Sequence, residues 1–154
     1  MTALGPLHRL RPYRPATDEG YALVSWVAEA IRGETFRRLD RDLAFRLLRP
    51  HVLALLDRLG PTLSVVVPAD RDEPIEAFCL VEGPVVHFLY VSGSFRGQGL
   101  MTRLLEHHGF PRGSTLACST DTRDLRGVMA KGLYDIHLRP DLLLIEAPTP
   151  SRRR

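Results

Sequence analysis

The sequence predicts one mixed α/β domain of the α+β type, in which a largely antiparallel central sheet is flanked by about four helices. Three observations lead to this fold class. Two helical stretches follow a short first strand, three extended runs then succeed one another, and helices alternate with strands in the rest of the chain. The chain has 154 residues, of which 44% are hydrophobic and 25% charged, and this is typical of one globular domain. We expect the domain to cover residues 1–147 and residues 148–154 to form a disordered basic tail.

The first expected elements are a strand and a helix. Residues 7–13 form a short, weakly patterned strand that Pro15 ends, and we expect it at an edge of the sheet. Thr17 or Asp18 can cap a helix that runs to about Arg32, because its apolar residues recur on one face.

A second helix is expected between Asp40 and Gly60, where leucines and valines recur at helical spacing. Pro50 lies inside this stretch and has no amide hydrogen to donate. We therefore expect Pro50 to kink or divide the helix.

The spacing of apolar residues changes from a helical to an extended pattern after Gly60. Residues 63–67, 75–81 and 85–91 are rich in β-branched and aromatic side chains and are separated by short turn-forming stretches. Sequential strands with short connections predict an antiparallel meander. The remaining expected elements are a helix over 100–108, a strand over 114–119, a helix from Asp121 or Thr122 that Gly132 stops, and strands over 134–138 and 142–145.

The most informative motif runs from Phe95 to Met101, between the third strand of the meander and an amphipathic helix. The first amides of a helix have no intrahelical partner, and with the helix dipole they favour anionic oxygens. Gly97 and Gly99 leave the backbone open to a phosphate, and Arg96 adds a positive charge. The motif lacks the third glycine of a dinucleotide fingerprint and the Gly-Lys-Ser/Thr of a P-loop.

This motif resembles that of the GNAT superfamily of acyl-CoA-dependent N-acyltransferases. The stretch from Arg96 to Met101 is similar to the family's pattern of Arg or Gln, two residues, Gly, one residue, then Gly or Ala. The preceding residues 88–91 and the following residues 102–105 extend the resemblance, and the order of elements over about residues 7–146 agrees with it. The chain departs from the pattern at its last position, where Met101 stands and a larger side chain would crowd the pyrophosphate.

The resemblance implies that acetyl-CoA, or another short acyl-CoA, is the cosubstrate, without a metal. It places the pantetheine arm where the strand before the loop splays from its neighbour, at about Tyr90 to Gly93. The cofactor-binding residues that it implies are Val91, Arg96, Gly97, Gln98, Gly99, Leu100 and Met101.

Two residues are candidates for proton transfer. His87 lies four residues before Val91, where members resembling this chain carry a catalytic glutamate, and a neutral imidazole suits a general base. The alternative is a strand histidine bonded to a neighbouring carbonyl. Met129 occupies the position of the family's helix tyrosine, so Tyr134 is the remaining candidate acid, unless it is a core aromatic.

The expected activity is transfer of an acyl group from acyl-CoA to a primary amine of an unknown acceptor, directly in a ternary complex. The alternative is a catalytically weak or inactive GNAT-fold module that binds CoA or another protein, since the chain is also similar to short GNAT-like proteins of phages and prophages. A homodimer is left open.

Composition also bears on nucleic-acid binding, on location in the cell and on the role of the cysteines. The pI of 9.2 arises from a terminal arginine run: without Arg152 to Arg154, 18 of the 21 basic residues remain against 18 acids, so nucleic-acid binding is not favoured. The sequence contains no apolar stretch that could span a bilayer and no apolar signal region, so we expect a cytoplasmic protein. Cys79 and Cys118 are expected to be small core residues, not metal ligands.

Overall fold

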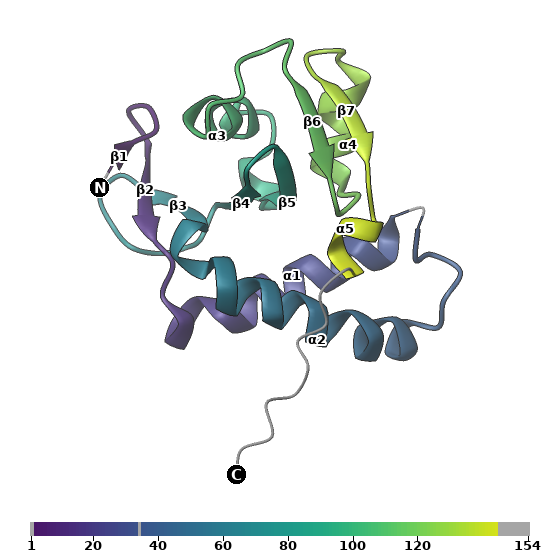
Figure 1. Cartoon of the computed structure of the whole chain (residues 1–154). Coiled ribbons are helices and arrows are strands. Elements are labelled where there is room, and N and C mark those ends of the chain that lie inside the picture. Colours follow the sequence, from purple (N-terminus) through teal and green to yellow (C-terminus); the bar gives the residue numbers. More distant parts are fainter. Residues whose placement is uncertain (1, 34, 145–154) are drawn as a thin grey trace.

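The computed structural model describes residues 2–33 and 35–144 and contains one seven-stranded sheet whose strands lie in chain order (Figure 1). The strands are β1 (Thr2–Ala3), β2 (His8–Pro12), β3 (Ser64–Pro68), β4 (Ala77–Glu82), β5 (Val85–Val91), β6 (Thr115–Cys118) and β7 (Asp135–Leu138). The helices are α1 (Pro15–Arg32), α2 (Arg41–Leu59), α3 (Leu100–His107), α4 (Arg123–Ala130) and α5 (Asp141–Leu144), with 3₁₀ turns at Gly60–Thr62 and Gly93–Phe95.

The predicted fold class is confirmed. Strands β1 to β5 pair antiparallel, whereas β5, β6 and β7 pair parallel to one another through the α3 and α4 crossovers. The five helices exceed the expected number by α5, which is a single turn.

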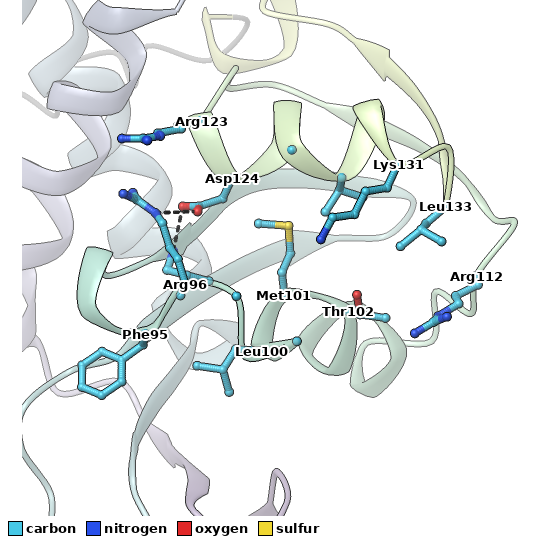
Figure 2. A pocket seen from close by; sticks show the side chains of 15 residues that line it. Phe95, Arg96, Leu100, Met101, Thr102, Arg112, Arg123, Asp124, Lys131 and Leu133 are labelled. Carbon is cyan, nitrogen blue, oxygen red and sulfur yellow. Dashed lines mark hydrogen bonds and ion pairs between the residues drawn. The ribbon is translucent and has the colours of Figure 1, made fainter.

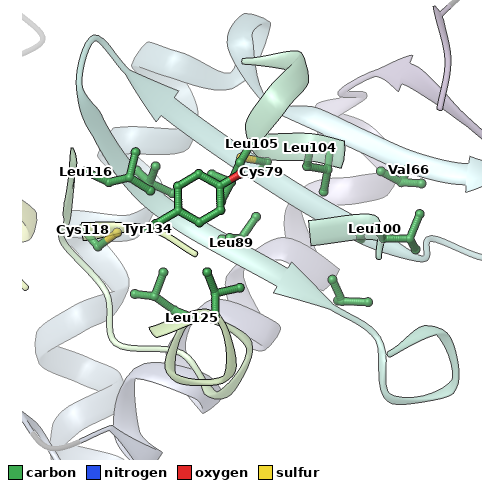
Figure 3. Close-up of a cluster of buried hydrophobic side chains, with 14 of the residues drawn as sticks. Val66, Cys79, Leu89, Leu100, Leu104, Leu105, Leu116, Cys118, Leu125 and Tyr134 are labelled. Carbon is green, nitrogen blue, oxygen red and sulfur yellow. The ribbon is translucent and has the colours of Figure 1, made fainter. Parts of the chain in front are cut away.

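Helices cover both faces of the sheet, and each face has its own apolar core. On one face, α3 and α4 pack through Leu104, Leu105 and Leu125 against strand residues such as Cys79 and Leu89 (Figure 3). The opposite face packs against α1 and α2, and its core contains Trp26, Leu48, Val65, Phe78 and Phe88. Because both faces are buried, strands β3 to β5 are nearly continuous apolar runs. Both cysteines are buried, as expected.

Three expectations about the N-terminal part need correction. β1 pairs with the outer side of β2, so β2 is not the edge strand. Neither Thr17 nor Asp18 caps α1, because the helix begins earlier, after Arg14, with Pro15 in its first turn. Pro50 does not divide α2, which is one helix from residue 41 to residue 59; it starts near Asp40 as expected, and Asp40 caps it.

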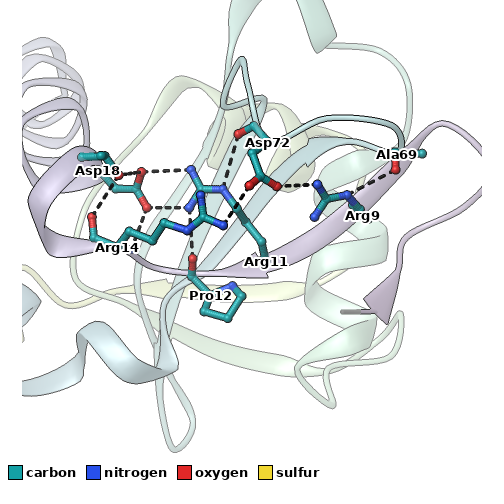
Figure 4. Close-up of polar contacts among 8 residues, drawn as sticks. Arg9, Arg11, Pro12, Arg14, Asp18, Ala69 and Asp72 are labelled. Atoms are coloured by element: carbon teal, nitrogen blue, oxygen red, sulfur yellow. Dashed lines mark hydrogen bonds and ion pairs between the residues drawn. The ribbon is translucent and has the colours of Figure 1, made fainter.

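A polar cluster fixes the start of α1 against the sheet (Figure 4). The Arg11 guanidinium donates to both carboxylate oxygens of Asp18, at 2.7 and 2.9 Å, and both side chains are buried. Asp18 also accepts the amide of Arg14. The Arg14 side chain and Arg9 both pair with Asp72, in the connection from β3 to β4. The cluster therefore ties β2, α1 and that connection together, and it accounts for the burial of Asp18.

The C-terminal part differs from expectation in one element. Residues 142–144 form α5 and not a strand, since Asp141 begins a helical turn directly after Pro140. The Arg139 side chain pairs with Asp141 at that start. The expected tail, residues 148–154, lies outside the described residues. Within residues 2–33 and 35–144, no helix has the length and apolar character needed to cross a membrane.

Candidate cofactor-binding site

A cavity of about 430 Å³ lies between α3 and α4, beside the end of β5 (Figure 2). This volume is in the range of small-molecule sites. Four of the lining residues are basic and one is acidic. The lining residues are Val91, Phe95, Arg96, Gly97, Gly99, Leu100, Met101, Thr102, Arg112, Arg123, Asp124, Gly127, Val128, Lys131 and Leu133.

The glycine-rich loop forms the cavity wall that leads into α3. Gly97 and Gly99 have φ angles of 80° and 74°, a left-handed conformation that other residues adopt only with strain. Gly99 is the N-cap of α3, and the first intrahelical hydrogen bond runs from Arg103 N to Gly99 O. The preceding helix amides thus have no intrahelical acceptor, so this wall offers donors to an anion.

Of the expected cofactor-binding residues, the structure brings all but Gln98 to this cavity. Gln98 is exposed and lies outside the lining. Met101 is half-buried and extends from α3 toward α4, so its thioether occupies part of the space between the two helices (Figure 2). If this side chain crowds a ligand, as expected from the sequence, it does so between α3 and α4.

The charge of Arg96 is largely neutralised within the protein. Its Nε donates to Asp124 Oδ1 at 2.9 Å, and its guanidinium lies 3.9 Å from the Glu29 carboxylate. Both carboxylates are buried. Burial is the largest single influence on Arg96 and opposes its charged form, but the hydrogen bond and charge of Asp124 together with the charge of Glu29 raise the arginine pKa. Arg96 thus fixes the loop to α1 and α4, whereas the sequence predicted that it adds positive charge for the ligand.

β5 and β6 separate before the position that the sequence predicted. The two strands pair only at Val85 and Val86, and the edge of β5 beyond them faces the segment between β6 and α4. Side chains of that segment bond to β5: Ser119 Oγ donates to His87 O, Thr122 Oγ1 donates to Leu89 O, and Asp124 Oδ2 accepts from Val91 N at 3.0 Å. Of the residues expected to be open for pantetheine, from Tyr90 to Gly93, Val91 therefore has its amide bonded to the protein itself.

Thr122 and Asp124 are placed by the start of α4. Thr122 is the N-cap, and its hydroxyl accepts from Leu125 N while donating to Leu89 O. Glu29 of α1 accepts from Arg123 N, so this helix start is bonded on two sides. Asp124, in the first turn, is consequently held against both β5 and the loop.

His87 lies on the other side of β5 from the cavity. Leu80 pairs with Phe88 and Val81 with Val86, so His87 is the extra residue of a β-bulge. Simple alternation along the strand would put His87 on the same face as Leu89 and Val91, but because of the bulge Val86 packs with those two residues instead.

The His87 ring is buried and bonded at both nitrogens. Nδ1 lies 2.9 Å from Ser119 Oγ, and Nε2 lies 3.2 Å from the carboxylate of Glu82, which also pairs with Arg58. Burial lowers the pKa of His87 below its usual value, although Glu82 opposes this shift. His87 lines a separate cavity of about 220 Å³ with Leu55, Arg58, Glu82, Val85, Leu142 and Leu143.

Tyr134 is a core residue in this structure. It is buried in the apolar cluster under α3 and α4, and its hydroxyl donates to Phe110 O at 3.2 Å (Figure 3). Burial raises the pKa of the phenol. Neither His87 nor Tyr134 lines the larger cavity, so the structure does not bring the two candidate proton-transfer residues to the glycine-rich loop.

Sequence reasoning missed Asp124 and the basic residues Arg112, Arg123 and Lys131. A helix was expected to begin at Asp121 or Thr122, which puts the carboxylate at position 124 in its first turn, and this signal could have identified Asp124. Lys131 is the only lysine of the chain. Among the described residues no group of three or more His, Cys, Asp or Glu side chains has the arrangement of a metal site.

Comparison of the chain with protein-family models, with curated proteins and with solved structures found no match.

Proposed function

We propose that this chain is a GNAT-type N-acyltransferase, which binds acyl-CoA in the cavity between α3 and α4 and transfers the acyl group to a primary amine. The observation that carries the proposal is the convergence of the Gly97–Gly99 loop, the start of α3 and four basic side chains on one cavity. A diphosphate needs many hydrogen-bond donors and compensating charge. The loop and the start of α3 supply the donors, and the charge comes from the other basic lining residues, since that of Arg96 is offset by Asp124 and Glu29.

In the proposed complex, main-chain amides at the start of α3 donate to the pyrophosphate oxygens. The thioester end of the donor then extends toward Val91 at the inner end of the cavity. The amine attacks the thioester carbonyl, the C–S bond breaks, and CoA leaves as a thiolate that takes up a proton. Among the described residues no histidine or tyrosine side chain lines this cavity, so we assign to water the removal of the proton from the attacking amine.

A second candidate function is CoA binding without turnover. It is favoured by the hydrogen bond between Asp124 and Val91 N, because a carboxylate at this amide occupies the donor group that a thioester carbonyl would use. The bonded positions of His87 and Tyr134 favour the same function.

Thiol release from acetyl-CoA, measured with and without a panel of primary amines, tests the transferase proposal. Amine-dependent release of free CoA, matched by acetylated amine in the mass spectrum, is the expected result. Binding of CoA without amine-dependent release across the panel would favour the second candidate, and absence of CoA binding would refute both.

A further inference from the structure

The two ends of the cavity differ in charge. At the inner end, beside β5, the Arg96 guanidinium pairs with the buried carboxylates of Asp124 and Glu29. These three groups sum to one negative charge, which the neighbouring Arg123 offsets, so this end has no net positive charge to attract an anion. The end farther from β5 is different, because its two cations come from different elements and face the cavity from opposite sides (Figure 2).

Lys131 and Arg112 are the cations of this outer end. Lys131 is the C-cap of α4, and Figure 2 shows its side chain reaching from α4 toward Met101. No described ion pair involves Lys131 among residues 2–33 and 35–144. Arg112 lies in the turn between α3 and β6, and its Nε is 3.9 Å from Glu106, with both side chains about half exposed or more. The pair between Arg112 and Glu106 is weak, because its distance is long and both side chains are exposed. Lys131 and Arg112 are therefore both available to a ligand.

The start of α3 and the outer cations supply two distinct anion sites. Main-chain amides of the loop and helix can bind a diphosphate by hydrogen bonds. A second phosphate, carried on the sugar of the nucleotide, would extend beyond the helix start toward the outer end. A phosphomonoester has a charge between −1.5 and −2 at neutral pH, so it is the group that gains most from a lysine and an arginine on opposite sides.

We propose that Lys131 and Arg112 bind the 3′-phosphate of CoA and make the cavity select CoA over nucleotides that lack this phosphate. The inference rests on the proposed function, since it names the part of the donor that the outer end recognises. It also gives the ligand its direction: the phosphomonoester lies between Lys131 and Arg112, and the thioester points to Val91.

Calorimetry with CoA and with 3′-dephospho-CoA tests the proposal, because the two ligands differ only in this phosphate. We expect the parent protein to bind CoA about 10-fold more tightly at low salt, a preference that falls as salt is added. Lys131→Met and Arg112→Met should each weaken CoA binding severalfold and leave dephospho-CoA binding unchanged. Arg126→Met is the matched control, since Arg126 is an exposed arginine of α4 that pairs with Asp121 and does not line the cavity.

The outcomes separate this inference from the proposed function. Equal affinity of the parent protein for the two ligands, or variants that weaken both ligands alike, would overturn the 3′-phosphate assignment while CoA binding stands. Binding of neither ligand would overturn the proposed function and the inference with it. Circular dichroism of each variant establishes that it is folded, which is expected at exposed positions.

Discussion

Asp124 accepts a hydrogen bond from the main-chain amide of Val91 at 3.0 Å, and its second carboxylate oxygen accepts from Arg96 at 2.9 Å. One side chain of α4 thereby joins the end of β5 to the glycine-rich loop. The carboxylate is buried and lines the cavity. It has a structural role in this structure and already accepts from the amide that the proposed thioester carbonyl would need.

Replacing Asp124 by alanine should make the site more receptive to an acyl donor. The variant frees the Val91 amide and removes a negative charge beside it, so we expect acetyl-CoA to bind severalfold more tightly, with little change for CoA. The unfolding free energy should fall by about 1–3 kcal/mol, because the hydrogen bonds from Val91 N and from Arg96 to this buried carboxylate are lost. Calorimetry and urea denaturation measure the two effects.

Asp124→Asn and Asp135→Asn provide the controls for this prediction. Asp124→Asn keeps the size and can still accept from Val91, whereas Asp135 is an exposed residue of β7 outside the cavity. Unchanged or weaker acetyl-CoA binding by a folded Asp124→Ala variant would show that the carboxylate does not compete with the donor.

Met101→Ala should strengthen CoA binding. The Met101 side chain occupies space between α3 and α4, where the pyrophosphate must approach the start of α3. Removing it enlarges the cavity, and we expect an affinity gain of severalfold with a small loss of stability, since the side chain is only half-buried. Met101→Leu, which keeps the bulk, should bind like the parent. An affinity for CoA that drops in the alanine variant would show that the thioether contacts the ligand favourably.

His87 should affect stability in a pH-dependent manner. Its folded-state pKa lies below the usual 6.5 because the ring is buried. As the pH falls through 6.5, the unfolded chain therefore binds a proton at His87 before the folded protein does. The stability that the neutral ring contributes is therefore present above about pH 6.5 and is lost at lower pH. Urea denaturation of the parent and of His87→Gln from pH 8 to 5 should give curves that converge as the pH falls. Parallel curves would contradict the assignment of a buried neutral imidazole.

Much of the fold follows from local patterns. The meander from β3 to β5 has strong β-branched runs divided by turn residues, and α2 and α4 start near Asp40 and Thr122, where helix starts were expected. The position of the glycine-rich loop before α3 follows from the change of period at residue 100. These features depend on residues close in sequence, which is why the sequence predicted them.

Features that depend on distant residues were not predicted. The bulge at His87 arises from the register between β4 and β5, and strict alternation along one strand cannot reveal it. Asp124 reaches Val91 only because α4 packs beside β5, 33 residues away in the chain. Residues 142–145 were expected as a strand because a short apolar run fits either state; residues 142–144 lie in α5, and residue 145 is outside the described residues.

The central claim is that the cavity between α3 and α4 binds CoA through the glycine-rich loop, and calorimetric titration of the parent protein and Gly99→Asp with CoA tests it most directly. The parent should bind, and Gly99→Asp should not, because it places a side chain and a negative charge at the start of α3, where φ is 74°. Gly83→Asp controls for backbone strain, since Gly83 has a φ of 55° in the distant turn between β4 and β5. No heat of binding from the folded parent at millimolar CoA, or equal binding by Gly99→Asp, would contradict the claim.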